Sequence, residues 1–367
     1  MNPTIESIID EDTTLQFKVN NINASLINAV RRIILSDIPC FVFRTFPYNK
    51  NKANIEINTT RFNNEIIKQR LSCIPIHISD LKFPYIDHIL EVEVENNSKE
   101  IMFVTTEDFK IKNITNNTYL NEDAIKKIFP PDSITSQYID FIRLQPQLAD
   151  NIPGEQIKLT CKFDIGTAKE SGTFNVVSTC AFGGSIDEEK IIEKWNEKLK
   201  TLDKEEHDDD DIEFIKKDWL IMEGARLVIP DSYDFKIKTI GIYSNFEIMK
   251  LACDIMINKF KKFVKDLQEE QLISDSHNTL ENSYDIKLID ESFTLGKVIE
   301  YLIYKLYFGK EITFVGFRQP HPHINVCILK IGFSQEVEND IIIQRLADIC
   351  NKGIEIYEIL KKEFVDK

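Results

Sequence analysis

One folding pattern occurs twice in this chain, and that repeat limits what the chain can fold into. Residues 15–19 and 284–288 both alternate apolar with polar side chains, which is typical of a half-buried strand. Each stretch is followed by a turn and a segment with helical apolar spacing, 23–32 in the first copy and 292–308 in the second. The alternating apolar residues are Leu15, Phe17 and Val19 in the first copy and Tyr284, Ile286 and Leu288 in the second.

Both copies also close in the same way. A strand pattern at 235–240 precedes a long amphipathic helix at 246–267, and a strand pattern at 326–331 precedes another at 338–364. A helix with one apolar stripe has to bury it, so two such sheet-plus-helix units can pack as a pseudo-symmetric pair. The alternative is an accidental match, because strand-helix-strand-helix is a common order.

The first copy is interrupted by a long segment of a different character. Short alternating runs at 55–57, 89–94, 101–104 and 157–163 are separated by Asn, Pro, Gly and Asp. They predict a mainly β domain over 47–180, with one helix at 63–73. The predicted fold is therefore α+β. Its domains are a first sheet-plus-helix domain (1–46 and 181–275), the inserted β domain (47–180) and a second sheet-plus-helix domain (276–367).

A strongly charged stretch from 181 to 218 separates the β domain from the rest of the first copy. It contains the acidic run 205–213, which we interpret as part of a solvated loop and not as a metal site, because uninterrupted Asp runs lack a shaped pocket. A linker around His277 joins the two copies.

Charge and hydropathy restrict the class of protein. The formal net charge is −15, whereas a surface that binds DNA needs clustered Lys and Arg, so we expect protein partners and no sequence-specific nucleic-acid contact. No apolar run reaches the roughly 18 residues of a membrane span, and the acidic N-terminus is not a secretory signal. We expect a soluble intracellular protein with no membrane contact.

Metal and cofactor binding are not predicted. The seven cysteines are dispersed and lack zinc-site spacing, and we interpret all seven as structural. His321 and His323 could share one face of a strand, but no third ligand is near them in the sequence. A strand connection is the preferred interpretation.

Catalysis is not predicted either. The sequence has no nucleophile elbow, no phosphate-cradling glycine loop and no His/Asp/Ser constellation. The two remaining classes are an assembly subunit of a larger complex and an independent acidic protein-binding scaffold.

Three segments of the first copy resemble the alpha-type subunit of multisubunit RNA polymerases, which is the D-type subunit of archaea and the third subunit of eukaryotes. NASLINAVRRIILSDIP (23–39) is similar to its opening helix, and GEQIKLTCKFDIGTAKES (154–171) to a strand and docking loop. RFNNEIIKQRLSCIPI (61–76) is similar to its second signature, with Ser72 and Cys73 in place of the usual Gly and Leu. Some members carry a zinc loop or an iron–sulfur insertion in the β domain. This chain lacks the cysteines for either, so its β domain must be held by its own apolar core.

The second copy resembles the small partner of that alpha-type chain, which is the L-type subunit of archaea and the eleventh subunit of eukaryotes. SFTLG (292–296) is similar to its His-Thr-Leu-Gly motif, with Phe293 for the His. VGFRQPHPHI (315–324) is similar to its Gly-Tyr-x-x-x-His-Pro connection, with Phe317 for the Tyr. The chain therefore resembles both subunits fused into one.

The resemblance implies a non-catalytic assembly platform of a DNA-directed RNA polymerase. The first copy would dock the second-largest subunit and the second copy the largest, with the small tenth-type and twelfth-type subunits as further partners. The residues implied for docking the second-largest subunit are Arg31, Arg32, Glu65, Arg70, Lys169 and Glu170. A solvated helix edge or loop is the alternative for each. The interface expected between the copies comprises Leu26, Val30, Ile33, Leu295, Val298, Leu302, Ile342 and Leu346.

Fusion of these two subunits is associated with large DNA viruses of eukaryotes, and the Ile-, Asn- and Lys-rich composition suits an AT-rich genome. For a viral source we expect the protein in virions and in cytoplasmic viral factories, and otherwise in the nucleus.

Overall fold

The computed structural model describes residues 2–147, 149, 153–202, 209–269, 271–276 and 280–364. This part of the chain is α+β, as predicted. It divides into two compact units, which are described separately. The first unit consists of Met1–Ile33, Thr179–Lys238 and Met249–Lys367, and the second of Ile34–Ser178 and Thr239–Ile248. None of the helices in the described ranges has the length and apolar content that a membrane crossing requires.

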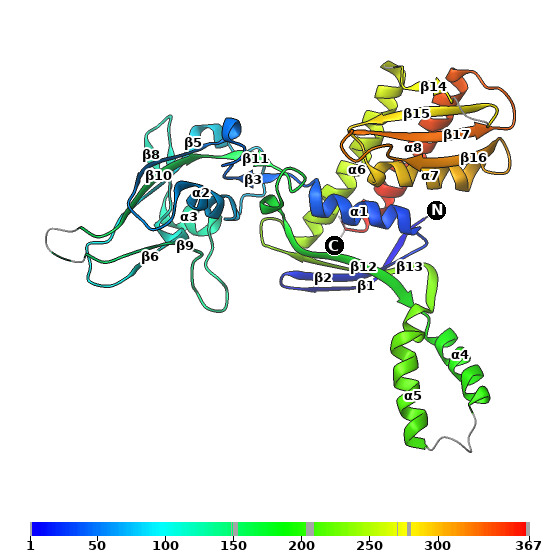
Figure 1. Ribbon diagram of the computed structural model, residues 1–367, viewed down its shortest axis with the longest axis horizontal. Coiled ribbons are helices and arrows are strands. Elements are labelled where there is room, and N and C mark those ends of the chain that lie inside the picture. Colours follow the sequence, from blue (N-terminus) through cyan, green and yellow to red (C-terminus); the bar gives the residue numbers. More distant parts are fainter. Residues whose placement is uncertain are drawn as a thin grey trace. The chain divides into compact units, whose positions relative to one another are not determined.

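The first unit contains two four-stranded sheets with the same arrangement (Figure 1). In the first sheet the order is β1-β2-β13-β12, with helix α1 after β2 and helix α6 after β13. In the second sheet the order is β14-β15-β17-β16, with α7 after β15 and α8 after β17. The elements of the first sheet are β1 (Thr4–Glu11), β2 (Thr14–Asn20), α1 (Ala24–Ser36), β12 (Val177–Ile186), β13 (Val228–Thr239) and α6 (Asn245–Glu269). Those of the second are β14 (Ile273–Asp275), β15 (Ser283–Ile289), α7 (Phe293–Tyr307), β16 (Ile312–Arg318), β17 (Val326–Phe333) and α8 (Asn339–Lys362).

The alternating pattern of each predicted strand is confirmed by burial. Leu15, Phe17 and Val19 of β2 point into the core, and so do the corresponding residues of β15. Phe17 lies opposite Phe235 of β13, and the two rings stack with centroids 5.2 Å apart. The helices lie between the two sheets, so each sheet buries one face (Figure 1).

The second unit is mainly β. Its sheets have the orders β4-β10-β5-β7-β8, β3-β11 and β6-β9. The strands are β3 (Cys40–Val42), β4 (Ala53–Asn58), β5 (His88–Glu95), β6 (Met102–Thr105), β7 (Lys110–Asn113), β8 (Thr118–Tyr119), β9 (Asp140–Leu144), β10 (Gln156–Lys162) and β11 (Asp164–Gly166), and the helices are α2 (Asn64–Ser72) and α3 (Glu122–Ile128). The short 3₁₀ turns within the described residues of both units are Tyr48–Lys50, Tyr85–Asp87, Thr106–Asp108, Gly172–Phe174 and Gly224–Arg226.

The elements predicted for this unit are largely confirmed. The helix predicted at 63–73 is α2, and Asn63 caps it by accepting a hydrogen bond from the backbone N–H of Ile66. The predicted strands correspond to β4, β5, β6 and β10. The core is aromatic, with the Phe109 ring edge-on to Phe129 and Phe141. This unit therefore has an apolar core of its own.

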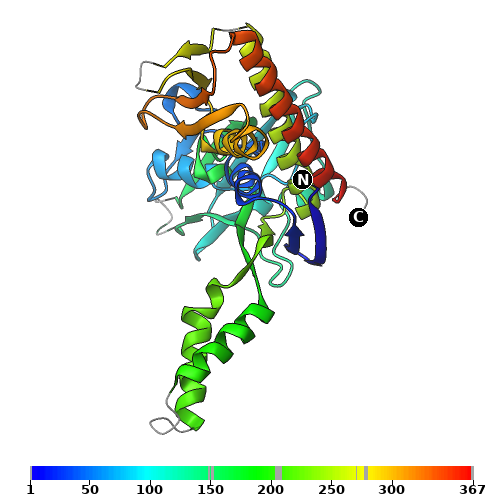
Figure 2. The ribbon, with the colours of Figure 1, turned by 90° about the vertical axis from the view of Figure 1, so that its right-hand side faces the viewer.

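The loop predicted for 181–218 is wrong. The stretch contains the end of β12 and then two helices, α4 (Glu188–Thr201) and α5 (Asp209–Met222), that lie side by side and lead away from the first sheet (Figures 1 and 2). The physical reason is a pair of indoles: Trp195 and Trp219 are both buried, with ring centroids 5.5 Å apart. An i,i+4 ion pair between Glu213 and Lys217 further supports α5. Of the acidic run 205–213, residues 205–208 lie outside the described residues.

Six of the seven cysteines are buried, as a structural role requires, and all seven are free thiols. Cys73 is the exception, because it is exposed at the C-terminal end of α2. Burial raises the pKa of Cys40, Cys180, Cys253 and Cys350 from 9.0 to about 12.

These raised thiol pKa values predict a loss of stability at alkaline pH. The folded chain holds its thiol protons more tightly than the unfolded chain, so their contribution is complete below pH 9 and is lost between pH 9 and 12, at about 1.4 kcal/mol per pH unit per thiol. The free energy of unfolding, measured with urea in reducing buffer, should therefore fall less steeply between pH 9 and 12 in Cys253→Ala than in the wild type. Cys73→Ala is the control and should keep the wild-type slope. Equal slopes in all three proteins would contradict the prediction.

Candidate functional site

A junction of helices in the first unit brings the two ends of the sequence together. The Tyr357 hydroxyl on α8 donates a hydrogen bond to the Leu26 carbonyl on α1, with an oxygen–oxygen distance of 3.0 Å. Tyr357 is completely buried, which raises its pKa well above 10 and keeps the hydroxyl protonated. Its ring also packs on Phe260 of α6, with centroids 6.1 Å apart. Tyr357 of α8, which follows the second sheet, thus contacts both α1 and α6, the two helices that follow strands of the first sheet.

The residues expected at the interface between the copies are all in the core of this unit. The eight residues, each exposed by 3% or less, are Leu26, Val30, Ile33, Leu295, Val298, Leu302, Ile342 and Leu346. They come from α1, α7 and α8, and α7 packs against α8. Their burial matches an apolar helix junction, and the assignment of each residue to an interface between two copies stays a prediction.

Arg32 connects α1 to the beginning of α7. Its Nε donates to Thr294 Oγ1 at 2.8 Å, and Thr294 is buried. The Ser292 hydroxyl, which caps α7, also donates to Thr294 Oγ1 at 3.1 Å. Arg31 instead uses its Nε on Asn28 of its own helix at 2.9 Å. The two arginines take different partners, as their helical positions predict. Arg32 is half-buried, and its role as a docking residue or as part of a solvated helix edge stays a prediction.

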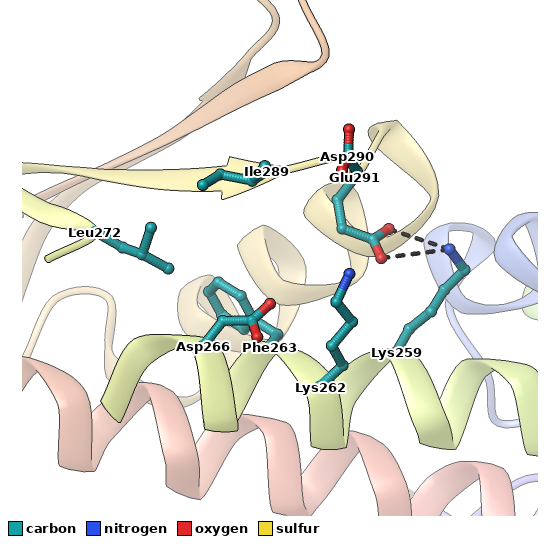
Figure 3. Close-up of a pocket in the computed structure, with 8 residues that line it drawn as sticks. All are labelled: Lys259, Lys262, Phe263, Asp266, Leu272, Ile289, Asp290 and Glu291. Carbon is teal, nitrogen blue, oxygen red and sulfur yellow. Dashed lines mark hydrogen bonds and ion pairs between the residues drawn. The ribbon is translucent and has the colours of Figure 1, made fainter. Parts of the chain in front are cut away.

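Ion pairs flank the helix junction. Lys361 of α8 donates to both carboxylate oxygens of Asp254 on α6, at 2.6 and 2.8 Å. Lys259 of α6 reaches both oxygens of Glu291, just before α7, at 3.3 Å (Figure 3). The second pair is the more buried, with side chains 18% and 11% exposed. It therefore loses less of its attraction to solvent screening than a surface pair does.

A small pocket of about 170 Å³ opens beside this second ion pair (Figure 3). Its lining mixes apolar and oppositely charged side chains: Lys259, Lys262, Phe263, Asp266, Leu272, Ile289, Asp290 and Glu291. The carboxylate of Glu291 is already paired, and no group of three or more metal-ligand side chains exists in the described residues. The pocket is too small for a typical organic cofactor, for which about 300 Å³ is the lower limit.

In the second unit, Arg44 organises the predicted docking loop. Its guanidinium contacts the Asp164 carboxylate at 2.5 Å, the Glu170 carboxylate at 2.6 Å and the Ile165 carbonyl at 2.8 Å. It also lies over the Phe174 ring, 5.6 Å from the centroid. Arg44 is only 7% exposed, whereas the side chains of its partners Asp164 and Glu170 are 27% and 46% exposed, so the guanidinium is buried beneath carboxylates that reach solvent. These contacts fix both ends of the loop that carries Glu170.

The other residues predicted for docking take separate places in this unit. Arg70 donates to the backbone carbonyls of Phe141 at 2.6 Å and Asp140 at 2.9 Å, which fastens α2 to β9. Glu65 is exposed in the first turn of α2, and Lys169 is exposed next to Glu170. The expectation that Glu65 and Arg70 contact different partners stays a prediction. Arg31 and Arg32 belong to the first unit.

The histidine pair lies between β16 and β17, as predicted for a strand connection. The ring centroids of His321 and His323 are 5.2 Å apart, and the backbone N–H of His323 donates to Nδ1 of His321 at 3.1 Å. That nitrogen is thereby occupied within the connection.

Several residues of these sites were missed by sequence reasoning. The position of Arg44 could have indicated a buried charge, since this arginine directly follows the apolar run Cys40–Phe43. Tyr357 and Thr294 gave none, because their partners are 331 and 262 residues away in the chain.

Replacing Arg44 should destabilise the protein strongly. Arg44→Leu leaves the Asp164 carboxylate and the Ile165 carbonyl without their donor, at a cost of about 2–4 kcal/mol, and Arg44→Lys should cost less because one charge contact survives. The matched control is Arg345→Leu, whose two-atom contact with Glu311 is much more exposed and should contribute less than about 1 kcal/mol. Urea unfolding measures both, and equal losses would show that burial of Arg44 is unimportant.

Comparison with known proteins places this fold in a family. Residues 16–260 match the family described as the RNA polymerase Rpb3/Rpb11 dimerisation domain. The DNA-directed RNA polymerase subunit Rpo3 of Methanosphaera stadtmanae is 23% identical over 279 residues, which cover 71% of this chain and 97% of that protein. The subunit RPAC1 of DNA-directed RNA polymerases I and III of Homo sapiens is 21% identical over 320 residues, which cover 74% of this chain and 86% of the relative. The family match spans well over half of the sequence, and the chain therefore belongs to the RNA polymerase Rpb3/Rpb11 dimerisation domain family.

Proposed function

We propose that this chain is a non-catalytic assembly subunit of a DNA-dependent RNA polymerase that combines the third-type and eleventh-type subunits in one polypeptide. Its first copy docks the second-largest subunit and its second copy the largest. The family match and the polymerase subunits among its relatives support the first part of this proposal.

The observation that carries the fusion is the repeated sheet. In both sheets the strand before the short helix is second and the strand before the long helix is third. The two remaining strands are the edges, with β1 corresponding to β14 and β12 to β16. The four helices meet between them through Arg32–Thr294, Tyr357–Leu26 and Lys361–Asp254. Two similar surfaces that bury each other are what a dimer of such units presents.

The extent of the alignments also supports a second unit. The archaeal relative is covered almost completely, yet its alignment uses 71% of this chain. The family match ends at residue 260, before β15 begins. The second sheet therefore follows the part of the chain that the family accounts for.

In the proposed organisation, 1–46 and 181–275 form the third-type dimerisation domain, 47–180 is inserted in it and 276–367 is the eleventh-type domain. The linker around His277 lies outside the described residues, which resume at 280. Docking of the second-largest subunit is assigned to Arg31, Arg32, Glu65, Arg70, Lys169 and Glu170. The last four of these residues are exposed, and the two residues of α1 are half-buried. We further propose that the small tenth-type and twelfth-type subunits are partners. We also propose that the source is viral, with the protein located in virions and viral factories.

Cutting the chain between the two copies tests the fusion directly. A protease site inserted between Ser276 and Leu280 should allow cleavage of the folded protein into two fragments that still co-elute in size-exclusion chromatography, because the helix junction is apolar and buried. Val298→Asp, which puts a carboxylate into that junction, should make the cleaved fragments separate. Separation of the wild-type fragments would contradict an intramolecular pair.

Purification from the native source tests the polymerase assignment. The tagged protein should co-purify in equal amounts with two very large chains and with RNA-synthesis activity. Recovery with small, unrelated partners would instead favour an acidic scaffold outside transcription.

Arg32→Glu tests the docking role within the same purification. We expect at least about tenfold less second-largest subunit, because a charge contact at a docking site is reversed. Thr294→Val is the control: it removes the internal acceptor of Arg32 but keeps the guanidinium, and should retain the second-largest subunit. An equal loss in both variants would assign Arg32 to the internal contact alone.

A further inference from the structure

The helical arm formed by α4 and α5 exposes apolar side chains that the fold does not use. Phe214 and Ile221 of α5 are 72% and 75% exposed, and Met222 is also exposed. Trp219 of the same helix is buried against Trp195 of α4. The two helices of the arm therefore pack on each other through the two indoles, while Phe214, Ile221 and Met222 stay exposed to water. Exposed apolar side chains of this kind mark interaction surfaces.

These apolar groups form a stripe along one side of α5. Phe214, Asp218 and Ile221 are four and three residues apart in turn, so they are neighbours on the helix surface. Trp219 and Ile212 occupy the side that faces away from this stripe. An aromatic and an aliphatic anchor two turns apart are the spacing with which one helix engages another.

The charge around the stripe specifies its partner. Asp210 and Asp211 lie one turn before Phe214, and Asp218 lies between the two anchors. The nearby Lys217 is bound to Glu213 at 2.7 Å, so its charge is already compensated. A segment that covers the stripe brings its own charges close to three aspartates, and cations there are favoured.

The same charges argue against other occupants. A second copy of α5 would place aspartates against aspartates, and a nucleic acid or an anionic membrane would be repelled. Within this unit, α4 and α5 lead away from the sheet, and the exposure of Phe214 and Ile221 shows that no described part of the chain covers them (Figure 2).

We propose that α5 is a docking site for a basic amphipathic helix of a partner protein. The apolar face of that helix packs on Phe214 and Ile221, and its Lys or Arg side chains pair with Asp210 and Asp218. This site is separate from the surfaces proposed for the two largest polymerase subunits, so it can fail without affecting that proposal.

Peptide binding to the full-length protein tests the proposal. The probes are a synthetic amphipathic helix of Leu and Lys and its counterpart of Leu and Glu, followed by fluorescence anisotropy. We expect the Leu/Lys peptide to bind, with a Kd at least tenfold higher in Phe214→Ser/Ile221→Ser and also higher in Asp218→Lys. Ile134→Ser, which removes an even more exposed apolar side chain from the second unit, should not change the Kd. Unchanged urea unfolding midpoints ensure that the variants are folded.

Two results would overturn the docking site. One is an unchanged Kd in the double variant, which would mean that the peptide is attracted only by the acidic character of the whole chain. The other is equal binding of the Leu/Glu peptide.

Photo-crosslinking in the native assembly identifies the occupant. A photoreactive phenylalanine analogue at position 214 should crosslink to a Lys- or Arg-rich segment with helical apolar spacing. Crosslinks only to a second copy of this chain, to an acidic segment or to lipid would overturn the proposal.

Discussion

The first unit depends on the burial of helix stripes that neither sheet can cover alone. Each sheet packs one side of its helices, and those helices carry further buried apolar side chains that need a second apolar layer. The second layer here comes from the other sheet's helices. Tyr357 shows how tightly the two layers are matched, because its hydroxyl finds the Leu26 carbonyl at 3.0 Å in a place without water. A buried hydroxyl without such a partner would cost about 1–3 kcal/mol.

Close packing at two glycines reinforces this match. A Cβ at Gly296 on α7 would lie 2.0 Å from the Phe317 ring, and a Cβ at Gly353 on α8 would lie 2.6 Å from the Phe260 ring. Both rings belong to elements that the helix must approach closely, and Phe260 has no exposed surface into which it could move. The SFTLG motif and the VGF motif, 21 residues apart, are therefore one packing contact. The motif glycine is required because the aromatic residue occupies the place of its side chain.

Sequence reasoning succeeded where periodicity and burial agree. The strands at Leu15–Val19 and Tyr284–Leu288 and the helices that follow them were predictable because one face of each is buried. It failed for α4 and α5, where the charged surface masks the signal and one Trp on each helix supplies the packing. It left Arg32 open between a docking contact and a solvated helix edge, since the sequence cannot show that Thr294, 262 residues later, supplies an acceptor. The contacts of Arg44 were missed for the same reason, with Asp164 120 residues away. Local pattern predicts elements, whereas long-range polar contacts require the assembled fold.

In the proposed fusion, covalent linkage changes what the helix junction has to achieve. Two separate subunits that pair at nanomolar concentration need about −12 kcal/mol of association free energy. Two copies joined by a short linker meet at an effective concentration on the order of millimolar, for which about −4 kcal/mol is sufficient. The junction can then contain polar contacts such as Tyr357–Leu26 and Lys361–Asp254, which contribute modestly to affinity but fix the alignment of the helices. Alignment is the property that a docking platform requires, because surfaces contributed by both copies have to face their partners at a fixed angle.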